Sequence, residues 1–240
     1  MARILLIETA TEVCSAAIAV NGEVAGIAEE LHSQNHAALL TLQIEECVKQ
    51  SGIPLAALDA VAVSRGPGSY TSLRVGASVA KGICYALDKP LIAIDTLLTL
   101  AWASRAMGNQ QSAANNPLFI PMLDARRQEV WAAVYDRSLR PVKSAQSLIL
   151  ENDLFEKYIQ EVPEHDQLDV LILSGSGSLK FQNVMNGEKV VFSPIKKCSA
   201  RYLAPLAEQF FQDVEFQNVA YFEPFYMKAP NITAPSQAPF

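Results

Sequence analysis

The chain has 240 residues, of which half are hydrophobic and 18% are charged, and its formal net charge is −6. Such a composition is typical of a globular protein with one large or two small cores, and it argues against a disordered chain. Proteins that bind nucleic acid alone usually carry a basic stripe, and none is visible here. Composition therefore disfavours a free-standing nucleic-acid-binding protein.

The compartment is indicated by the cysteines and the apolar runs. Four scattered cysteines form no C-x-x-C pair, which predicts buried thiols in a reducing compartment. No run approaches the roughly 20 apolar residues of a membrane span, and Glu8 interrupts the N-terminal apolar run. We expect a cytoplasmic protein without membrane contact.

The first half alternates strands and helices. Asn21-Gly22 predicts a tight hairpin, and Ser33 is the expected N-cap of the first helix. The strands are expected over residues 3–7, 13–20, 23–30, 58–63 and 91–95, and the helices over about 34–50, from the turn after 68 to about 87, and from 97 to 105.

The second half repeats this pattern after a polar stretch over residues 106–117. Its strands are expected over residues 118–123, 129–135, 141–149 and 170–173, and its helices over about 152–160 and 200–212. Asp124 follows its first strand as Glu8 follows the first strand of the chain. Ser174 likewise opens a glycine turn, as Ser64 does. The near-equal offsets indicate a duplicated half-domain.

The element order is that of the ribonuclease-H-like half-domain, which is used twice in ATPases of the actin and Hsp70 type (the ASKHA fold). We therefore expect an α/β protein with two lobes. The first lobe is expected over residues 1–105 and a smaller second lobe over 106–228. The proline-rich residues 229–240 are expected to form an extended tail.

The segment from Ser64 to Arg74 leaves a strand, turns through Gly66-Pro67-Gly68 and opens a helix. Ser69, Thr71 and Ser72 offer hydroxyl groups to the first helical turn. The arrangement resembles an anion cradle, but the turn alone favours a tight strand-to-helix turn. Neither the Walker phosphate loop nor the G-x-G-x-x-G fingerprint matches the segment.

In a duplicated actin-like fold, nucleotide lies between the lobes and faces the acids at the ends of the two first strands. Here these acids are Glu8 and Asp124. The loop Thr9-Ala10-Thr11 lacks the glycine that lets backbone N–H groups close on phosphate. The alternative is that the acids cap turns or pair with Arg126 or Arg74. We therefore expect a degenerate nucleotide cleft at Glu8, Thr9 and Asp124.

Metal and nucleophile chemistry are poorly supported. His32 and His36 are four residues apart, but the cap at Ser33 places His32 before the helix, and a solvated pair is the expected arrangement. Ser69 does not lie in a G-x-S-x-G elbow. The sequence predicts no catalytic residue, no metal site and no cofactor.

Two helices of the first half have unusual surfaces. Leu39, Leu40 and Leu42 spread apolar character widely around the first helix. Ser72, Gly76 and Ala80 form a strip of small residues on the second, where a glycine costs up to about 1 kcal/mol relative to alanine. One interpretation is a helix-on-helix interface with a partner formed by all six residues. The alternative is close packing of the strip on the chain's own sheet.

Four segments resemble the bacterial TsaB (YeaZ) family: I-L-L-I-E-T-A-T at 4–11, R-G-P-G-S-Y-T-S-L-R at 65–74, L-D-A-R-R-Q-E-V at 123–130 and E-P-F-Y-M-K at 223–228. The chain departs from the usual pattern at Tyr70, where Phe is usual, and at Ser72, where Gly is usual. The residues that carry the motif are Arg65, Gly66, Pro67, Gly68, Ser69, Thr71, Arg74, Asp124, Arg126 and Glu129.

The resemblance implies a non-catalytic subunit that pairs with its catalytic paralogue, TsaD, through the first-lobe helices. It also implies an ATPase partner, TsaE, and contact with tRNA only through the complex. That complex moves a threonylcarbamoyl group from its adenylate onto N6 of adenosine 37 in tRNAs that read codons starting with A. A homodimer through the same helices and an ATPase or glycoprotease-like metallopeptidase remain the alternatives.

Overall fold

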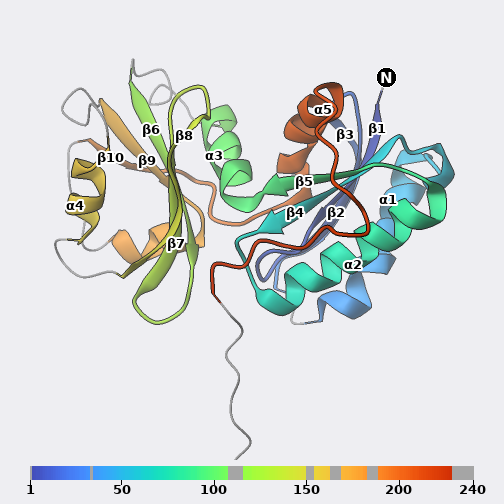
Figure 1. The fold of residues 1–240 in the computed structure, drawn as a ribbon, viewed down its shortest axis with the longest axis horizontal. Helices are drawn as coiled ribbons and strands as arrows, with labels where there is room; N and C mark the ends of the chain where they lie inside the picture. The colour runs from blue at the N-terminus through green and yellow to red at the C-terminus, as the bar shows by residue number, and fades with distance from the viewer. Residues whose placement is uncertain are drawn as a thin grey trace, which may run out of the picture.

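Two lobes lie side by side in the computed structural model, each built around a five-stranded mixed sheet (Figure 1). The structure describes residues 2–32, 35–107, 116–149, 154–162, 169–182 and 189–228. All four cysteines are buried and free, as the sequence predicts. None of the described helices is both long enough and apolar enough to cross a membrane.

The first sheet has the strand order β3-β2-β1-β4-β5. Its strands are β1 (Arg3–Glu8), β2 (Cys14–Val20), β3 (Glu23–Glu30), β4 (Ala60–Gly66) and β5 (Leu91–Asp95). β1 is antiparallel to β2 and parallel to β4. Asn21 and Gly22 have φ angles of 52° and 77°, the left-handed conformation that a tight β2–β3 hairpin requires. The predicted hairpin is therefore confirmed.

The second sheet has the order β10-β9-β6-β7-β8 and repeats the connectivity of the first. Its strands are β6 (Pro117–Asp124), β7 (Glu129–Tyr135), β8 (Pro141–Ile149), β9 (Val170–Ser174) and β10 (Val190–Phe192). β6 is antiparallel to β7 and parallel to β9, just as β1 is antiparallel to β2 and parallel to β4. The duplicated ribonuclease-H-like fold is confirmed. The short β10 was not predicted.

The outer face of the first sheet is covered by α1 (His36–Ser51) and α2 (Tyr70–Leu87), with a short turn of helix, η1 (Leu55–Ala57), between them. The side chain of Asn35 caps α1. The predicted cap, Ser33, lies outside the described residues. In the second lobe, α4 (Leu154–Gln160) takes the place of α1, and the six-residue η4 (Ser176–Phe181) takes the place of α2.

The last helix of each half packs on the other half's sheet. α3 (Thr96–Met107) follows β5 but buries Leu97 and Leu100 against Phe119 of the second sheet. η5 (Ala200–Leu203) and α5 (Ala204–Gln212) follow β10 but bury Leu203 against Ile4 of the first sheet. The lobes are interlocked by this exchange.

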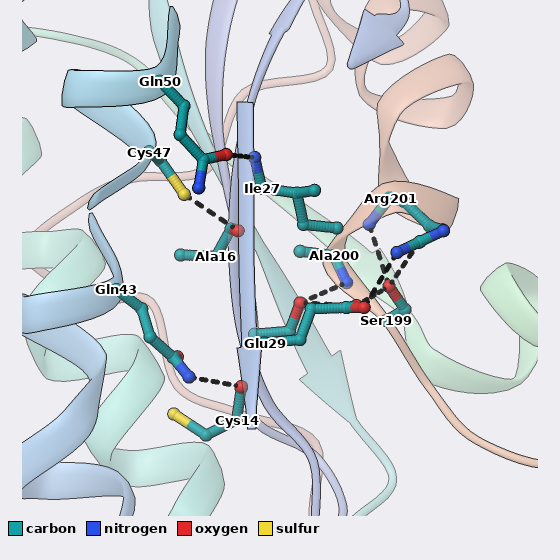
Figure 2. A network of polar contacts seen from close by, with 11 residues as sticks. Cys14, Ala16, Ile27, Glu29, Gln43, Cys47, Gln50, Ser199, Ala200 and Arg201 are labelled. Carbon is teal, nitrogen blue, oxygen red and sulfur yellow. Dashed lines mark hydrogen bonds and ion pairs between the residues drawn. The ribbon is translucent and has the colours of Figure 1, made fainter. Parts of the chain in front are cut away.

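Polar contacts hold η5 to the first lobe (Figure 2). Arg201 donates to Glu29 of β3 at 2.9 Å, and the backbone N–H of Ala200 donates to the hydroxyl of Ser15 on β2 at 3.1 Å. The predicted second lobe over 106–228 is therefore wrong at its C-terminal end, because residues 200–212 cover the first sheet. The amphipathic pattern that predicts this helix does not say which sheet it covers.

Residues 213–228, which we name the C-terminal strap, also return to the first lobe. In Figure 1 the strap is the dark red segment that leaves α5 and runs alongside α2. Gln217 pairs with Leu91 at the edge of β5, and Phe222 is buried in the core between α2 and the first sheet. The predicted tail over 229–240 lies outside the described residues.

Candidate functional site

Glu8 ends β1 and is fully buried. Its Oε1 atom accepts hydrogen bonds from the backbone N–H of Ala10 at 2.7 Å and from the hydroxyl of Ser64 at 2.9 Å, while its Oε2 atom has no partner. Burial raises the pKa of this carboxyl to about 7, against the opposing effect of the hydrogen bonds. The side chain therefore braces the loop that follows β1 and presents no oxygen to solvent.

The loop after Glu8 lies directly against α2. The backbone N–H of Thr9 donates to Ser64 at 3.4 Å, which ties the loop to β4. A Cβ atom added to Gly76 would lie 2.3 Å from Oγ1 of Thr9, and one added to Gly68 would lie 2.3 Å from the carbonyl oxygen of Ala10. The two glycines are therefore needed for the close approach of the chain's own loop.

Asp124, at the end of β6, is exposed and makes its contacts through Oδ1 within its own lobe. Its Oδ1 atom accepts from the backbone N–H of Arg126 at 2.7 Å and from Nζ of Lys180 at 2.5 Å. Lys180 also donates to the carbonyl oxygens of Arg127 and Glu129, at 2.8 and 3.0 Å. The acid caps its turn, as the alternative interpretation expected, but its charged partner is Lys180 and not the side chain of Arg126.

The glycine turn after β4 binds the strap. A Cβ atom at Gly66, where φ is +109°, would lie 2.4 Å from the carbonyl oxygen of Phe225. The backbone N–H of Phe225 donates to the carbonyl oxygen of Arg65 at 2.6 Å, and the guanidinium of Arg65 pairs with Asp95 at 2.7 Å. Buried Pro67 completes the turn.

Of the three hydroxyl groups predicted to serve the first turn of α2, Ser69 alone is seen to accept from a backbone N–H group among the described contacts. Ser69 is the N-cap of this helix, with its side chain accepting from the backbone N–H of Ser72, and its backbone N–H donates to the carbonyl oxygen of Ala10 at 2.7 Å. Thr71 is exposed in the first turn. The segment is a packed strand-to-helix turn, in which Ser69, Gly66 and Gly68 serve the fold.

The strap links both lobes through side chains. The ring of Tyr226 lies 4.6 Å from that of Tyr70, and the guanidinium of Arg74 lies 5.5 Å from the centre of the Tyr70 ring. Further along, Lys228 forms an ion pair with Glu129 of β7. The hydrogen bond from Lys228 lowers the pKa of the Glu129 carboxyl most, and the hydrogen bond from Ser147 lowers it further.

The six residues of the predicted partner interface do not form one exposed face. Leu40, Gly76 and Ala80 are buried in the first lobe, so the strip of small residues on α2 packs on the chain's own sheet and loop. The interpretation of that strip as partner-facing is wrong for Gly76 and Ala80. Leu39 and Ser72 are half-buried, and Leu42 is 59% exposed.

The inner face of α1 is unusually polar (Figure 2). Gln43 donates to the carbonyl oxygen of Cys14 at 2.9 Å, and the thiol of Cys47 donates to that of Ala16 at 3.0 Å. His36 is also buried, with Nε2 3.2 Å from the carbonyl oxygen of Val13. Polar side chains thus anchor α1 to β2.

The two predicted solvated histidines differ from each other. His32 lies exposed in a turn, with Nε2 3.0 Å from Nζ of Lys197, whereas His36 is buried, so the expectation is wrong for His36. Among the described residues, no three His, Cys, Asp or Glu side chains are grouped so that they could hold a metal ion.

Comparison with known proteins assigns the family. Residues 9–237 match the family model described as tRNA N6-adenosine threonylcarbamoyltransferase (TsaD). The chain is 28% identical over 233 residues to the Escherichia coli tRNA threonylcarbamoyladenosine biosynthesis protein TsaB, and this match covers 94% of each chain. The chain belongs to the TsaB branch of this family.

Other relatives agree. The Haemophilus influenzae TsaB is 35% identical over 128 residues, which are 53% of this chain and 51% of that protein. The structure of YeaZ from Pseudomonas aeruginosa superimposes with a TM-score of 0.77 at 26% identity and covers 94% of this chain and all of that one. These matches confirm the resemblance to TsaB in the sequence.

The chain also matches a kinase of the same two-lobed fold and a tRNA N6-adenosine threonylcarbamoyltransferase. A polyphosphate/ATP-glucomannokinase from Arthrobacter shares the two-lobed fold, with a TM-score of 0.53 at 13% identity over 88% of this chain and all of that one. The Geobacillus kaustophilus tRNA N6-adenosine threonylcarbamoyltransferase is 32% identical over 124 residues, which are only 36% of its length and 45% of this chain.

The sequence did not predict the contacts of Lys180 or of the strap, which connect the family motifs in the structure. Lys180 carries no motif signal, because a lone lysine in a polar helix is indistinguishable from a solvated one. The convergence of the strap on the turn after β4 was also missed. The glycine at position 66 is a signal for it, since a left-handed glycine beside a strand marks a close approach of backbone.

Proposed function

We propose that the chain is a cytoplasmic, non-catalytic subunit of the complex that places threonylcarbamoyl on N6 of adenosine 37 of tRNA. The observation that carries this proposal is that the chain itself uses both strand-end acids, Glu8 by burial and Asp124 through its Oδ1 atom. Glu8 is buried on Ala10 and Ser64, and Asp124 is paired with Lys180. A magnesium-nucleotide site of the actin type needs these carboxylates free. Catalysis therefore belongs to a partner.

The partner that fits is the catalytic paralogue TsaD, with TsaE as the ATPase. Support comes from the outer surface of α1 and α2, which we name the docking face and define by Leu39, Leu42, Ser72, Val75 and Val79. Because His36 and Gln43 turn inward, α1 leaves Leu42 exposed and Leu39 half-buried. Val75 and Val79 of α2 are also half-buried. Leu39, Val75 and Val79 pack partly on the core, and together with the exposed Leu42 their outer surfaces favour a helix-on-helix contact.

The charge supports an indirect role toward tRNA. The net charge of −6 opposes the approach of a polyanion. Contact with tRNA is therefore assigned to the complex as a whole, in which the partner supplies the basic surface.

Reconstitution tests the proposal. The purified chain is mixed with the threonylcarbamoyl-adenylate and unmodified tRNA, and modification is followed by mass spectrometry of the nucleosides. We expect no product from the chain alone and full modification after TsaD, TsaE and ATP are added. Omitting the chain from the complete mixture should abolish turnover. Product formation by the chain alone would refute the non-catalytic role.

A further inference from the structure

A groove of about 550 Å³ runs between α2 and the strap. Its walls are Lys81, Gly82 and Tyr85 on one side and Asn218, Val219 and Ala220 on the other. We name it the strap groove. It lies on the helix that also carries the docking face, since Val75 and Val79 precede Gly82 on α2.

Two features of the strap groove have no explanation within the chain. A Cβ atom at Gly82 would meet nothing within 4 Å, so the chain's own packing does not require glycine there. Glycine inside a helix nevertheless costs up to about 1 kcal/mol relative to alanine. Two tyrosines also stand exposed, Tyr85 on the groove wall at 87% and Tyr221 next to Ala220 at 84%. Exposed tyrosines beside an open depression are typical of protein interfaces.

Two polar side chains of the lining, Lys81 and Asn218, are engaged within the chain. Nζ of Lys81 donates to the carbonyl oxygens of Ala220 and Phe222, both at 3.1 Å. Oδ1 of Asn218 accepts from the backbone N–H groups of Ala220 and Tyr221, at 3.0 and 3.3 Å. The surface that remains is mainly apolar, which suits an aliphatic or aromatic side chain better than a polar small molecule.

The charges around the strap groove favour a protein occupant over a nucleic acid. Tyrosine rings can stack on the bases of a single-stranded nucleic acid, but its phosphate groups would then also lie close to this surface. The strap exposes the carboxylates of Asp213, Glu215 and Glu223. On α1 the carboxylate of Glu46 is exposed, and that of Glu45 is paired with Lys49. These acids repel phosphates and complement a basic rim on a protein partner.

We propose that the strap groove receives an aliphatic or aromatic side chain from a helix of the catalytic paralogue, extending the docking face from α2 onto the strap. This inference rests on the proposed function. The absence of a side chain at position 82 is the feature that admits the partner's side chain.

The test introduces a side chain at Gly82 that fills the strap groove. Gly82→Leu places a side chain in open space, so we expect a melting temperature equal to or above that of the original chain, while the Kd for TsaD in isothermal titration calorimetry rises at least tenfold. Tyr85→Ala removes one wall and should raise the Kd about fivefold. The matched control is Gln209→Leu, an exposed position on α5 across the first sheet, which should leave the Kd unchanged.

The outcomes separate the two proposals. If the original chain does not bind TsaD at all, the proposed function fails and the inference fails with it. If the original chain binds and Gly82→Leu binds equally well, only the inference is overturned. If Gly82→Leu abolishes self-association in light scattering but leaves TsaD binding intact, the occupant is a second copy of this chain, which also overturns it.

Discussion

Glu8→Gln should remove a pH dependence from the folding stability of this protein. The Glu8 carboxyl is fully buried, and burial raises its pKa from 4.5 to about 7. Between these values the folded chain holds a proton that the unfolded chain releases. The contribution of Glu8 to folding stability is therefore greatest below pH 4.5. It falls as the pH rises to about 7 and stays constant above that pH. At 1.36 kcal/mol for each pKa unit, the loss amounts to about 3 kcal/mol.

Glutamine resembles the protonated acid at this position. Its Oε1 atom can accept from Ala10 and Ser64 as the carboxyl does. Above pH 7 the variant should therefore be more stable than the original chain, by up to about 3 kcal/mol, whereas below pH 4.5 the two should match.

Urea unfolding of both proteins at half-unit steps from pH 4.5 to 8 measures the difference, and subtraction cancels the titration of other groups. Glu215→Gln serves as a control for charge removal at an exposed position. A constant stability difference between the Glu8 variant and the original chain across this range would show that Glu8 does not titrate there. The argument from burial would then be refuted.

Three further predictions concern local packing and are checked by urea unfolding. Gly76→Ala should destabilise the folded chain by about 1–3 kcal/mol, because the new Cβ atom would lie 2.3 Å from Oγ1 of Thr9. Adding Thr9→Ala should recover most of the loss, and additive effects of the two substitutions would contradict the contact. Ser69→Ala should cost about 1 kcal/mol through the lost cap of α2, and no loss would show that the cap is dispensable. Lys228→Ala should cost less than about 1 kcal/mol, since the ion pair is partly exposed; high salt should reduce the difference, and a larger, salt-insensitive loss would contradict a simple surface pair.

Local signals in the sequence predict most of the fold. The Asn21-Gly22 turn fixes the hairpin because only residues that tolerate a left-handed backbone suit it. Ser69 marks the start of α2 because its hydroxyl satisfies a backbone N–H that has no helical partner. Each of these features depends on neighbours within a few residues, so the sequence alone carries them.

Long-range choices could not be predicted in the same way. A small residue such as Gly76 signals a close approach, but the pattern does not say whether the chain's own Thr9 or another protein approaches. The same holds for His36, which lies in the predicted helix but whose burial depends on the carbonyl oxygen of Val13, just before β2. The exchange of α3 and α5 between the sheets was likewise invisible, because an amphipathic helix can cover either sheet.

The four motifs that identify the family are packing elements that meet around the strap. Ser69 of the second motif donates to Ala10 of the first, and Phe225 of the fourth covers Gly66. Lys228 of the fourth motif then pairs with Glu129 of the third, across the two lobes. In these contacts each of the named motif residues engages another part of the chain. Substitutions at these contacts should therefore lower the folding stability first. Under the proposed function, tRNA modification should then fall only in proportion to the folded chain that is lost.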